Sequence, residues 1–393
     1  MDIAIAGAGI GGLAAGVLLA QAGHAVQIYD RFDAPRPVGS GLVIQPVGLV
    51  VLDHLGAGEA VRTAGAVIER MLGIEAVTGA RVLDVRYRRN GHGSGTAGLG
   101  IHRASLFAAL WQVAMAAGVT VTPKATVTDA PLRGSKRALI LDDGQHEGPF
   151  DLVIDASGSA SRLSPLRGHP LPYGAIWGTV PWPQDTHLPM DQLTQRYRRA
   201  NRMAGVLPIG TPPGAGRSAA VFWSLPVRDL DRWQATPLDQ WKAEATTLWP
   251  AIARFLTAIE THAQMTPARY SHGTLRTPFA PALAFIGDAA HRASPQLGQG
   301  ANMALLDAFA LAWALTRERG DAALALYARS RRWHVRLYQM MSAAFTPQYQ
   351  SDSTLLPVLR DHILAPLSAL RPTQAILSRL VSGTLIPPVA GHA

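Results

Sequence analysis

Near the start of the chain, apolar residues are spaced as they are in a strand, a helix and a second strand. Residues 2–6 form a short apolar run, residues 11–22 are rich in alanine and leucine, and residues 25–29 are apolar again and end at Asp30. This order predicts a β-α-β unit with two parallel strands. Glycines lie between the first strand and the helix, where the chain must turn tightly.

Similar patterns return further along the chain and complete the same layer. The predicted elements are a helix at residues 104–117, strands at 119–129, 137–141 and 151–156, a last strand at 283–287 and a last helix at 301–317. Strands that alternate with helices favour a parallel sheet covered by helices. We therefore expect one sheet to be assembled from three separated stretches of the chain.

The stretch between these segments has a different pattern. Residues 170–268 contain many prolines and tryptophans, and apolar and polar positions alternate in segments such as 203–207 and 219–223. Alternation predicts a mostly antiparallel sheet with one face in water. Residues 238–261 predict a helix on this sheet. We interpret the region as a second domain inserted into the first.

Two further stretches are irregular. Residues 91–100 are glycine-rich and are expected to form a mobile hairpin or crossover. After about residue 336 the pattern is that of amphipathic helix, interrupted at Pro347, Pro357, Pro366 and Pro372. Because proline disrupts helices, we expect the helix to break at these four positions.

Composition narrows the classes of function. The 393 residues are 48% hydrophobic and carry a formal net charge of +9, and three lysines stand among many arginines. The arginines are scattered in short groups, so a nucleic-acid partner is not expected. The absence of cysteine excludes disulfides and thiolate chemistry. His262 and His272 have no ligand spacing with other residues, so no metal site is expected.

The termini give expectations about location. No basic segment precedes an apolar one at the start, and no run of about 18 apolar residues occurs. A cytoplasmic protein, monomeric or homodimeric, is therefore expected. Residues 355–359 and 363–367 are apolar and are candidates for a dimer face or, as the less favoured role, a peripheral membrane contact.

The first glycine turn has the spacing of a dinucleotide-binding motif. Gly7, Gly9, Gly11 and Gly12 follow a strand and open a helix. In such a motif Gly7 makes the turn, Gly9 admits a pyrophosphate and Gly12 allows the helix to pack. Asp30 ends the second strand, where a carboxylate can accept hydrogen bonds from an adenosine ribose. The motif alone does not distinguish NAD from FAD.

A second glycine-rich turn lies more than 250 residues later. After the apolar strand come Gly287-Asp288, His291, Pro295, Gly298, Gly300 and Asn302, and then an apolar helix. Such a turn directs free N–H groups and the positive end of a helix dipole toward a ligand. This environment suits a ring system that carries negative charge when it is reduced.

Four segments in order resemble a known family. They are the N-terminal Gly-x-Gly-x-x-Gly, residues 101–106 with Arg103, residues 151–162 and Gly287-Asp288. Together they resemble single-component FAD-dependent aromatic hydroxylases of the para-hydroxybenzoate hydroxylase type. The resemblance covers roughly residues 1–50, 100–165 and 270–320, the predicted nucleotide-binding layer.

The resemblance implies a role for several residues. Asp30 would hold the adenosine ribose, Arg103 would reach the pyrophosphate or ribityl region, and Asp288 would hydrogen-bond the ribityl chain. Pro295 would flank the isoalloxazine, and the backbone from Gly298 would contact its pyrimidine edge. The complete set expected to bind FAD is Gly7, Gly9, Gly11, Gly12, Asp30, Arg31, Arg103, Val127, Asp288, Pro295, Gly298, Gly300, Ala301 and Asn302.

With this resemblance the expected fold is α/β, with three parts. They are a Rossmann-like FAD-binding domain of discontinuous segments, an inserted antiparallel-sheet substrate domain and a C-terminal helical region. The predicted boundaries are residues 1–70, 100–168 and 269–335 for the FAD-binding domain, 71–99 and 169–268 for the substrate domain, and 336–393 for the helical region.

Candidates for catalysis are fewer and rest on position. Pro295 and His291 would lie beside the ring, although His291 also suits a hydrogen-bonding role in the turn. Tyr173 and Trp223, together with Trp177 and His272, lie on segments that could line a pocket for a planar substrate; plain core packing is the alternative. Asp307, in the last helix, is expected to be structural.

One position departs from the family. Where the family has Asp-Gly, this chain has Ser157-Gly158, with Asp155 two positions earlier. A serine does not supply a carboxylate, and the family motif is associated with both flavin and reduced nicotinamide. Either Asp155 compensates or the enzyme uses a different reductant.

The expected function is that of an FAD-dependent NAD(P)H monooxygenase. The resemblance implies that NAD(P)H reduces the flavin, O2 forms a flavin hydroperoxide, and an aromatic or other electron-rich small molecule is hydroxylated. The ring is expected to swing between positions, accommodated by the Gly39–Gly41 turn. Alternatives are an FAD-dependent double-bond reductase on the same scaffold and a flavin-binding protein without turnover.

Overall fold

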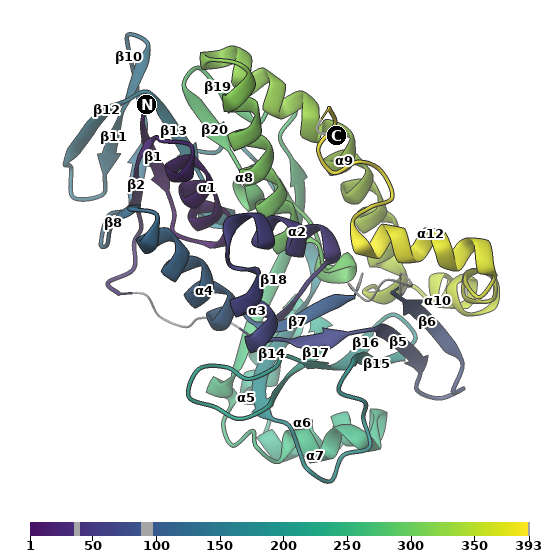
Figure 1. The fold of residues 1–393 in the computed structure, drawn as a ribbon. Helices are drawn as coiled ribbons and strands as arrows, with labels where there is room; N and C mark the ends of the chain where they lie inside the picture. The colour runs from purple at the N-terminus through teal and green to yellow at the C-terminus, as the bar shows by residue number, and fades with distance from the viewer. Residues whose placement is uncertain (35–39, 88–96, 392–393) are drawn as a thin grey trace.

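The computed structural model describes residues 1–34, 40–87 and 97–391. Two main sheets organise these residues: a helix-covered parallel sheet near the N-terminus and a long mixed sheet beside it (Figure 1). The last segments run back along one side of both, and helix α9 extends along this side. The predicted α/β class, with an FAD-type layer, a second sheet and a C-terminal helical region, is confirmed.

The first sheet, within the described residues, has six strands in the order β19-β20-β13-β1-β2-β8. Their bounds are Phe279–Ala280, Leu283–Phe285, Leu152–Asp155, Asp2–Ala6, Ala25–Tyr29 and Thr120–Thr122. The four pairs from β20 to β8 are parallel, and β19 is antiparallel to β20. Chain segments far apart in sequence therefore end at one edge, which is where ligands bind in open parallel sheets.

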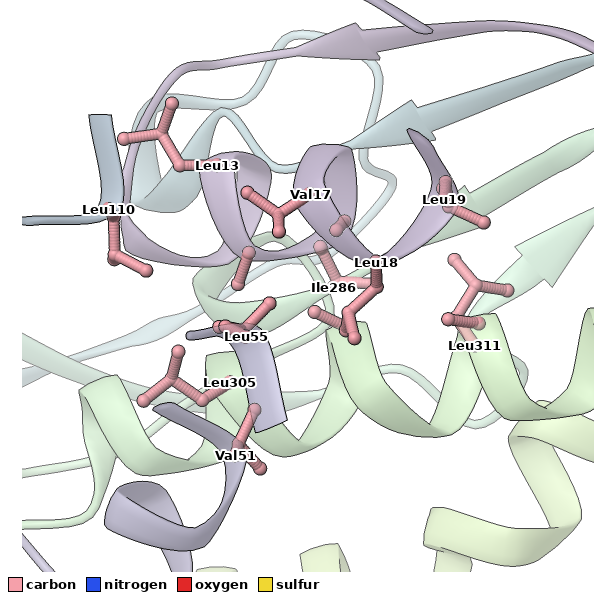
Figure 2. Close-up of a cluster of buried hydrophobic side chains, with 14 of the residues drawn as sticks. Leu13, Val17, Leu18, Leu19, Val51, Leu55, Leu110, Ile286, Leu305 and Leu311 are labelled. Carbon is pink, nitrogen blue, oxygen red and sulfur yellow. The ribbon is translucent and has the colours of Figure 1, made fainter. Parts of the chain in front are cut away.

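Helices bury an apolar core against this sheet. Helix α1 (Ile10–Gln21) packs on α8 (Gly300–Arg317), with α2 (Pro46–Leu55) and α4 (Arg103–Ala116) beside them. Figure 2 shows the contact, made by Leu13, Val17, Leu18 and Leu19 of α1, Val51 and Leu55 of α2, Leu110 of α4, Ile286, and Leu305 and Leu311 of α8. Each buried leucine stabilises the fold by roughly 2 kcal/mol. This core fixes both glycine-rich turns relative to each other.

Two small sheets flank the first. One joins β3 (Gly41–Ile44), β7 (Gly98–His102) and β4 (Ala66–Ile68). The other joins β9 (Val127–Asp129), β10 (Leu132–Arg133), β11 (Lys136–Leu141) and β12 (His146–Phe150). The predicted strand at 119–129 is thus two strands, because Lys124 adopts a positive φ of 53° between them.

The second sheet contains, among the described residues, eight strands in the order β21-β18-β14-β17-β16-β15-β5-β6. Their bounds are His291–Arg292, Met265–Thr274, His169–Pro181, Ser218–Pro226, Arg202–Pro208, Gln192–Arg198, Arg70–Glu75 and Arg81–Arg86. Antiparallel pairing dominates, as predicted, but β15 and β5 are parallel. The parallel pair joins an early segment of the chain to the middle one.

Both faces of the central strands are covered, so the prediction of one face in water is wrong. All nine positions of β17 are buried. One face packs against α5 (Leu230–Ala235), α6 (Leu238–Leu248) and α7 (Ala253–Leu256). The other face packs against Val43 of β3 and against Tyr349 of the C-terminal region. The predicted helix at 238–261 is interrupted by a short 3-10 turn at Pro250–Ile252.

The C-terminal region is helical but does not break at every proline. The remaining helices are α3 (Gly58–Ala64), α9 (Gly320–Tyr349), α10 (Leu355–Leu359), α11 (Ala365–Ser368) and α12 (Arg371–Ser382). Pro347 lies inside α9 and Pro357 inside α10, so the predicted breaks there are wrong. Pro372 lies in the first turn of α12, where the missing N–H costs nothing, whereas Pro366 lies where a π-helical stretch, Arg360–Leu364, continues into α11.

Some predicted segments cross the observed elements. The proposed domain boundaries at 99/100, 268/269 and 335/336 fall inside β7, β18 and α9; the division into domains stays a prediction. Residues 98–100 of the glycine-rich stretch are strand rather than mobile hairpin, and its earlier part lies outside the described residues, as does Gly39. No helix among the described residues is long and apolar enough to span a membrane.

Candidate cofactor and substrate site

The turn between β1 and α1 is closed by two glycines and left open by a third. Gly7 has a φ of +101°, and a Cβ on Gly12 would lie 1.9 Å from the Gly7 carbonyl oxygen. At Gly9, nothing lies within 4 Å of the position of a Cβ. The first intrahelical hydrogen bond runs from the Leu13 N–H to the Gly9 oxygen. The preceding N–H groups therefore remain available for an anion beside Gly9.

The carboxylate of Asp30 is held across this turn. Its Oδ2 accepts the Ala8 N–H at 2.6 Å, and its Oδ1 accepts the Phe32 N–H at 3.1 Å. Each oxygen keeps a lone pair, so the predicted contact with a ribose hydroxyl remains sterically and chemically available. Arg31 is exposed beside it, whereas Val127 is buried in an apolar cluster behind β2. Val127 is thus placed to pack rather than to hydrogen-bond.

Gly287 and Asp288 continue from the end of β20. Gly287 has a φ of +59°, and a Cβ there would lie 3.1 Å from the Ala304 Cβ of α8. The Asp288 side chain is exposed to solvent, although protein atoms surround its carboxyl group. Burial raises the pKa of Asp288, against the opposing attraction of His291 and Arg103. The structure therefore brings Arg103 and Asp288, 185 positions apart in sequence, into electrostatic contact.

Asp155, the candidate substitute for the carboxylate missing at Ser157, is bonded within its own turn. Asp155 is fully buried, and its Oδ1 accepts both the hydroxyl and the N–H of Ser157, at 2.5 and 3.0 Å. Its Oδ2 accepts the Ser161 hydroxyl at 2.5 Å. Burial raises the pKa of Asp155 although these hydrogen bonds oppose the shift. The carboxylate shapes the turn after β13 and faces inward, so the geometry gives a compensating role of Asp155 no support.

The second glycine turn leads into α8. Pro295 is exposed, and Gly298 has a left-handed φ of +60°. Around Gly300, nothing lies within 4 Å of the position of a Cβ. The first bond of α8 joins the Met303 N–H to the Gln299 oxygen, so the N–H groups of Gly300, Ala301 and Asn302 precede it. Room and free donors are therefore present together.

The side chain of Asn302 is structural. Its Oδ1 accepts the Gln45 N–H at 2.8 Å, and its Nδ2 donates to the carbonyls of Gly298 and Val43 at 2.9 and 3.3 Å. Asn302 is fully buried. Its predicted contribution to a flavin is thus through the backbone, while its amide ties the turn to β3.

Three glutamines beside this turn carry unpaired polar atoms. Among the described residues, Gln45 Nε2, Gln296 Nε2 and Gln299 Oε1 are buried without a hydrogen-bond partner. A Cβ on Gly298 would lie 3.2 Å from Gln45 Nε2, so this donor is directed at the turn. The pyrimidine edge of a flavin offers both acceptors and donors, and buried polar groups need such partners. The residues present therefore fit an isoalloxazine ring. No motif in the sequence pointed to these glutamines.

His291 is held by a buried ionic network rather than free for proton transfer. Its Nε2 lies 2.6 Å from Asp307 Oδ2, which also accepts the Gly287 N–H at 2.9 Å. Arg331 donates to Asp307 Oδ1 at 2.8 Å. Burial alone would raise the pKa of Asp307, but the charges and hydrogen bonds of His291 and Arg331 lower it to about 2. The geometry favours a positioning role for His291 and the structural role predicted for Asp307.

Register places the tryptophans of the second sheet on opposite faces. Trp223 pairs with Ile176, and both lie in the core under α5–α7. Trp177 pairs with Phe222 on the other face, where their rings lie 4.4 Å apart. Because successive side chains of a strand point to opposite faces, Trp223 lies on the face opposite Trp177, and its place in a substrate pocket stays a prediction. Trp177 also donates from its Nε1 to the Tyr270 hydroxyl at 3.0 Å.

Tyr173 shares the Trp177 face of β14 but is bound elsewhere. Its ring is buried, and its hydroxyl donates to Asp352 Oδ1 at 2.5 Å; Asp352 also pairs with Arg228. Burial, and then the hydrogen bond to Asp352, raise the pKa of Tyr173. This contact ties β14 to the segment after α9. The geometry gives the predicted catalytic role of Tyr173 no support.

A buried group of hydroxyls lies next to Pro295. Ser294 Oγ is 2.9 Å from Ser342 Oγ and 2.5 Å from Thr346 Oγ1, and Ser342 Oγ is 3.2 Å from His272 Nε2. His272 is thus turned toward α9, away from its predicted place among pocket residues. Ser342 and Thr346, one turn apart in a long helix, were missed, because such residues at that spacing are common on helix surfaces.

A cavity of about 640 Å³ lies between α4 and the second sheet. Phe107 and Trp111 line it from α4, and Trp177 lines it from β14. His102 and Ala104, the neighbours of Arg103, also line it. This size lies within the usual range for small-molecule pockets. An aromatic cavity thus adjoins the predicted path of the cofactor.

A family model described as an FAD binding domain matches residues 1–341. The chain belongs to this FAD-binding family. The match covers both glycine turns and most of the second sheet. FAD is therefore the cofactor that the fold and the site geometry serve, and the predicted resemblance to FAD-dependent aromatic hydroxylases is confirmed.

Among curated relatives, an FAD-dependent urate hydroxylase of Klebsiella pneumoniae is 26% identical over 340 residues, covering 83% of this chain and 84% of that protein. A 3-hydroxybenzoate 6-hydroxylase of Klebsiella oxytoca is also 26% identical, covering 83% and 82%. Among solved structures, Klebsiella pneumoniae HpxO complexed with FAD and uric acid has a TM-score of 0.82 at 22% identity, covering 98% of each chain. At that identity the structural likeness bears on the fold alone.

Proposed function

We propose that this member of the FAD-binding family is a monooxygenase that uses NAD(P)H and O2 to hydroxylate an aromatic or other electron-rich small molecule. The observation that carries the proposal is the aromatic cavity lined by His102 and Ala104, the neighbours of Arg103, and by Trp177 of the second sheet. The curated relatives named above act on urate and on a hydroxybenzoate, both flat and electron-rich, which supports this substrate class.

Bound FAD would supply the redox chemistry, taking electrons from NAD(P)H and passing them to O2. The chain would bind and orient it. The first turn would hold the pyrophosphate beside Gly9, with Asp30 at the ribose and Arg103 and Asp288 further along. The open space at Gly300 and the amide of Gln45 would receive the ring at its pyrimidine edge.

The second sheet would exclude water and position the substrate. Trp177 and Phe222 form an apolar wall, and the hydrogen bond from Trp177 Nε1 to the Tyr270 hydroxyl fixes this wall in place. An apolar, closed site protects a reactive oxygen donor from water. His291, bound to Asp307, would act as a positioning residue behind the ring rather than as the base.

The test is oxygen transfer from labelled O2. Purified protein should be yellow with the FAD spectrum, and NAD(P)H oxidation should increase with one member of a panel of hydroxylated aromatic acids, purines and quinolones. With 18O2, the product should gain one labelled oxygen. NAD(P)H oxidation that no compound stimulates, with no labelled product, would reject the monooxygenase in favour of a reductase or a carrier.

Two tryptophan variants test where the substrate binds. Trp177→Leu removes a ring from the cavity and should raise KM or increase uncoupled NAD(P)H oxidation. Trp223→Leu removes a ring of the same kind from the opposite face, and should lower thermal stability while leaving KM unchanged. Equal effects of both variants on KM would contradict the proposal that the substrate binds on the face of the sheet that carries Trp177.

A further inference from the structure

A second cavity, of about 830 Å³, lies between α9 and the segment Thr274–Phe279. We call it the α9 cavity. None of the residues in the set expected to bind FAD lines it. It nevertheless reaches the buried network, because His291 and Asp307 form part of its wall. Its size suits a molecule as large as a nucleotide.

The rim of the α9 cavity is strongly basic. Arg329, Arg332 and Arg336 lie three and four positions apart on one face of α9, and Arg276 comes from the facing segment. All four are exposed, and within the described part of the chain none forms an ion pair with a carboxylate. The only acidic lining residue is Asp307, which Arg331 and His291 already occupy.

This arrangement is unfavourable unless an anion is present. Like charges at helical spacings of three and four destabilise a helix. The guanidinium groups of Arg332 and Arg336 lie 5.2 and 5.3 Å from the Trp333 ring, which holds them without neutralising them. Arginine forms paired hydrogen bonds with phosphate oxygens, so several free arginines at one cavity suit a phosphorylated ligand.

The wall of the cavity is less polar than its rim. Leu275, Phe279 and Val335 line it beside the arginines, and Phe279 and Leu275 are only half-buried. An apolar wall next to a cationic rim fits a ligand with a planar part and a charged part. We propose that the α9 cavity binds a nucleotide-sized phosphorylated molecule, with its phosphates on the four arginines and its planar part against Leu275 and Phe279.

Such a ligand would also act on the cofactor turn. Asp307 accepts the Gly287 N–H at 2.9 Å and forms part of the cavity wall. Binding in the cavity would therefore change the surroundings of Asp307 and, through it, the strand end that carries Asp288. The two sites are linked by one buried carboxylate, so ligand and FAD affinities should be coupled and the coupling reciprocal.

The experiment is calorimetric titration of the FAD-loaded protein with ADP and with inorganic pyrophosphate, because loading with FAD removes its adenosine site from the measurement. We expect saturable binding of one ADP per chain. The double variant Arg329→Gln/Arg336→Gln should weaken binding at least tenfold. The control Arg198→Gln/Arg371→Gln loses the same charge at exposed positions outside the cavity, and should bind ADP as the original protein does.

The outcomes separate clearly. Pyrophosphate that displaces ADP supports phosphate recognition by the arginines. No saturable binding of either probe, or equal weakening in the cavity and control variants, would overturn the proposal. The visible spectrum of bound FAD and the hydroxylation assay should be unchanged in the cavity variant, since none of its arginines is expected to contact the cofactor or the substrate. Failure of this proposal would thus leave the proposed monooxygenase untouched.

Discussion

The two ends of the predicted FAD site are built differently. At the adenosine end, backbone and side chain within one β-α-β unit make the site: Gly12 closes on Gly7, and Asp30 accepts two N–H groups from nearby positions. At the flavin end, the turn is held by residues distant in sequence. Asn302 binds Gln45, and Gln299 donates to the Val381 carbonyl at 2.8 Å.

The difference is between a site formed by local backbone structure and a site that depends on long-range contacts. A local turn forms wherever its glycines and flanking strands are present, because its geometry depends on backbone sterics. A turn whose side chains hydrogen-bond to backbone carbonyls of β3 and α12 and to hydroxyls of α9 depends on the whole fold being assembled. Substitutions elsewhere in the fold should therefore leave the geometry of the adenosine end unchanged, whereas they should alter the geometry of the flavin end.

The largest expected effect on FAD binding is at the adenosine end. Gly12→Ala would place a Cβ 1.9 Å from a carbonyl oxygen, and should cost about 3 kcal/mol of folding stability and abolish FAD binding. Gly9→Ala meets open space, and should change the stability of the apoprotein by less than about 0.5 kcal/mol. It should nevertheless weaken FAD binding, because the methyl group occupies the expected pyrophosphate position.

Urea unfolding of the apoproteins and titration with FAD measure both quantities. The two variants add the same methyl group one turn apart, so they control for each other. Normal FAD affinity in Gly9→Ala would contradict the placement of the pyrophosphate.

The next effect concerns the flavin end and acid. The pKa of Asp307 is lowered from 3.8 to about 2, so its contribution to stability is complete above about pH 4 and is lost as the pH falls through 2. This contribution is about 2 kcal/mol. Asp307→Asn leaves Arg331 buried without its partner and should cost about 3–5 kcal/mol at neutral pH.

Unfolding free energies between pH 2 and pH 7 test this expectation. The original protein should lose stability between pH 4 and pH 2, and the Asn variant should lose about 2 kcal/mol less over that interval. An identical pH dependence in both proteins would show that Asp307 is not the group that titrates.

The smallest effect separates the two ends spectroscopically. Asn302→Ala removes three hydrogen bonds from the second turn, and should raise the Kd for FAD about tenfold, a change of about 1.4 kcal/mol. Because the ring's surroundings change, the visible spectrum of bound FAD should shift. Asp30→Ala should weaken FAD binding without shifting the spectrum. A spectral shift in the Asp30 variant alone would reverse the assignment of the two ends.

The sequence allowed the cofactor layer to be predicted well, and for a physical reason. Parallel strands buried on both faces and helices with glycine-rich starts leave strong local patterns. Gly7, Asp30 and Gly298 could be placed from such patterns. Gln45, Ser342 and Thr346 could not, because their importance comes from which distant backbone or hydroxyl they meet.

The second sheet was predicted less accurately because both its faces are buried. Alternation in β17 suggested a wet face, but all its positions are covered, so the pattern did not reveal which tryptophan faces the cofactor side. Trp177 and Trp223 were therefore both named as candidates for one pocket, although they lie on opposite faces. Pairing register, which joins Trp223 to Ile176 and Phe222 to Trp177, decides the matter, and register depends on contacts that one chain segment does not encode.

Helix α9 gives the molecule a single stiff rod about 45 Å long, at 1.5 Å for each of its 30 residues. In the first half of α9, Arg331 donates a hydrogen bond to Asp307 in the network behind Gly287; near the end of the helix, Thr346 hydrogen-bonds with Ser294 and Tyr349 packs against the second sheet. Because α9 is held at these two places, neither place can move independently of the other. A displacement of the second sheet should therefore also displace the turn that is expected to contact the flavin.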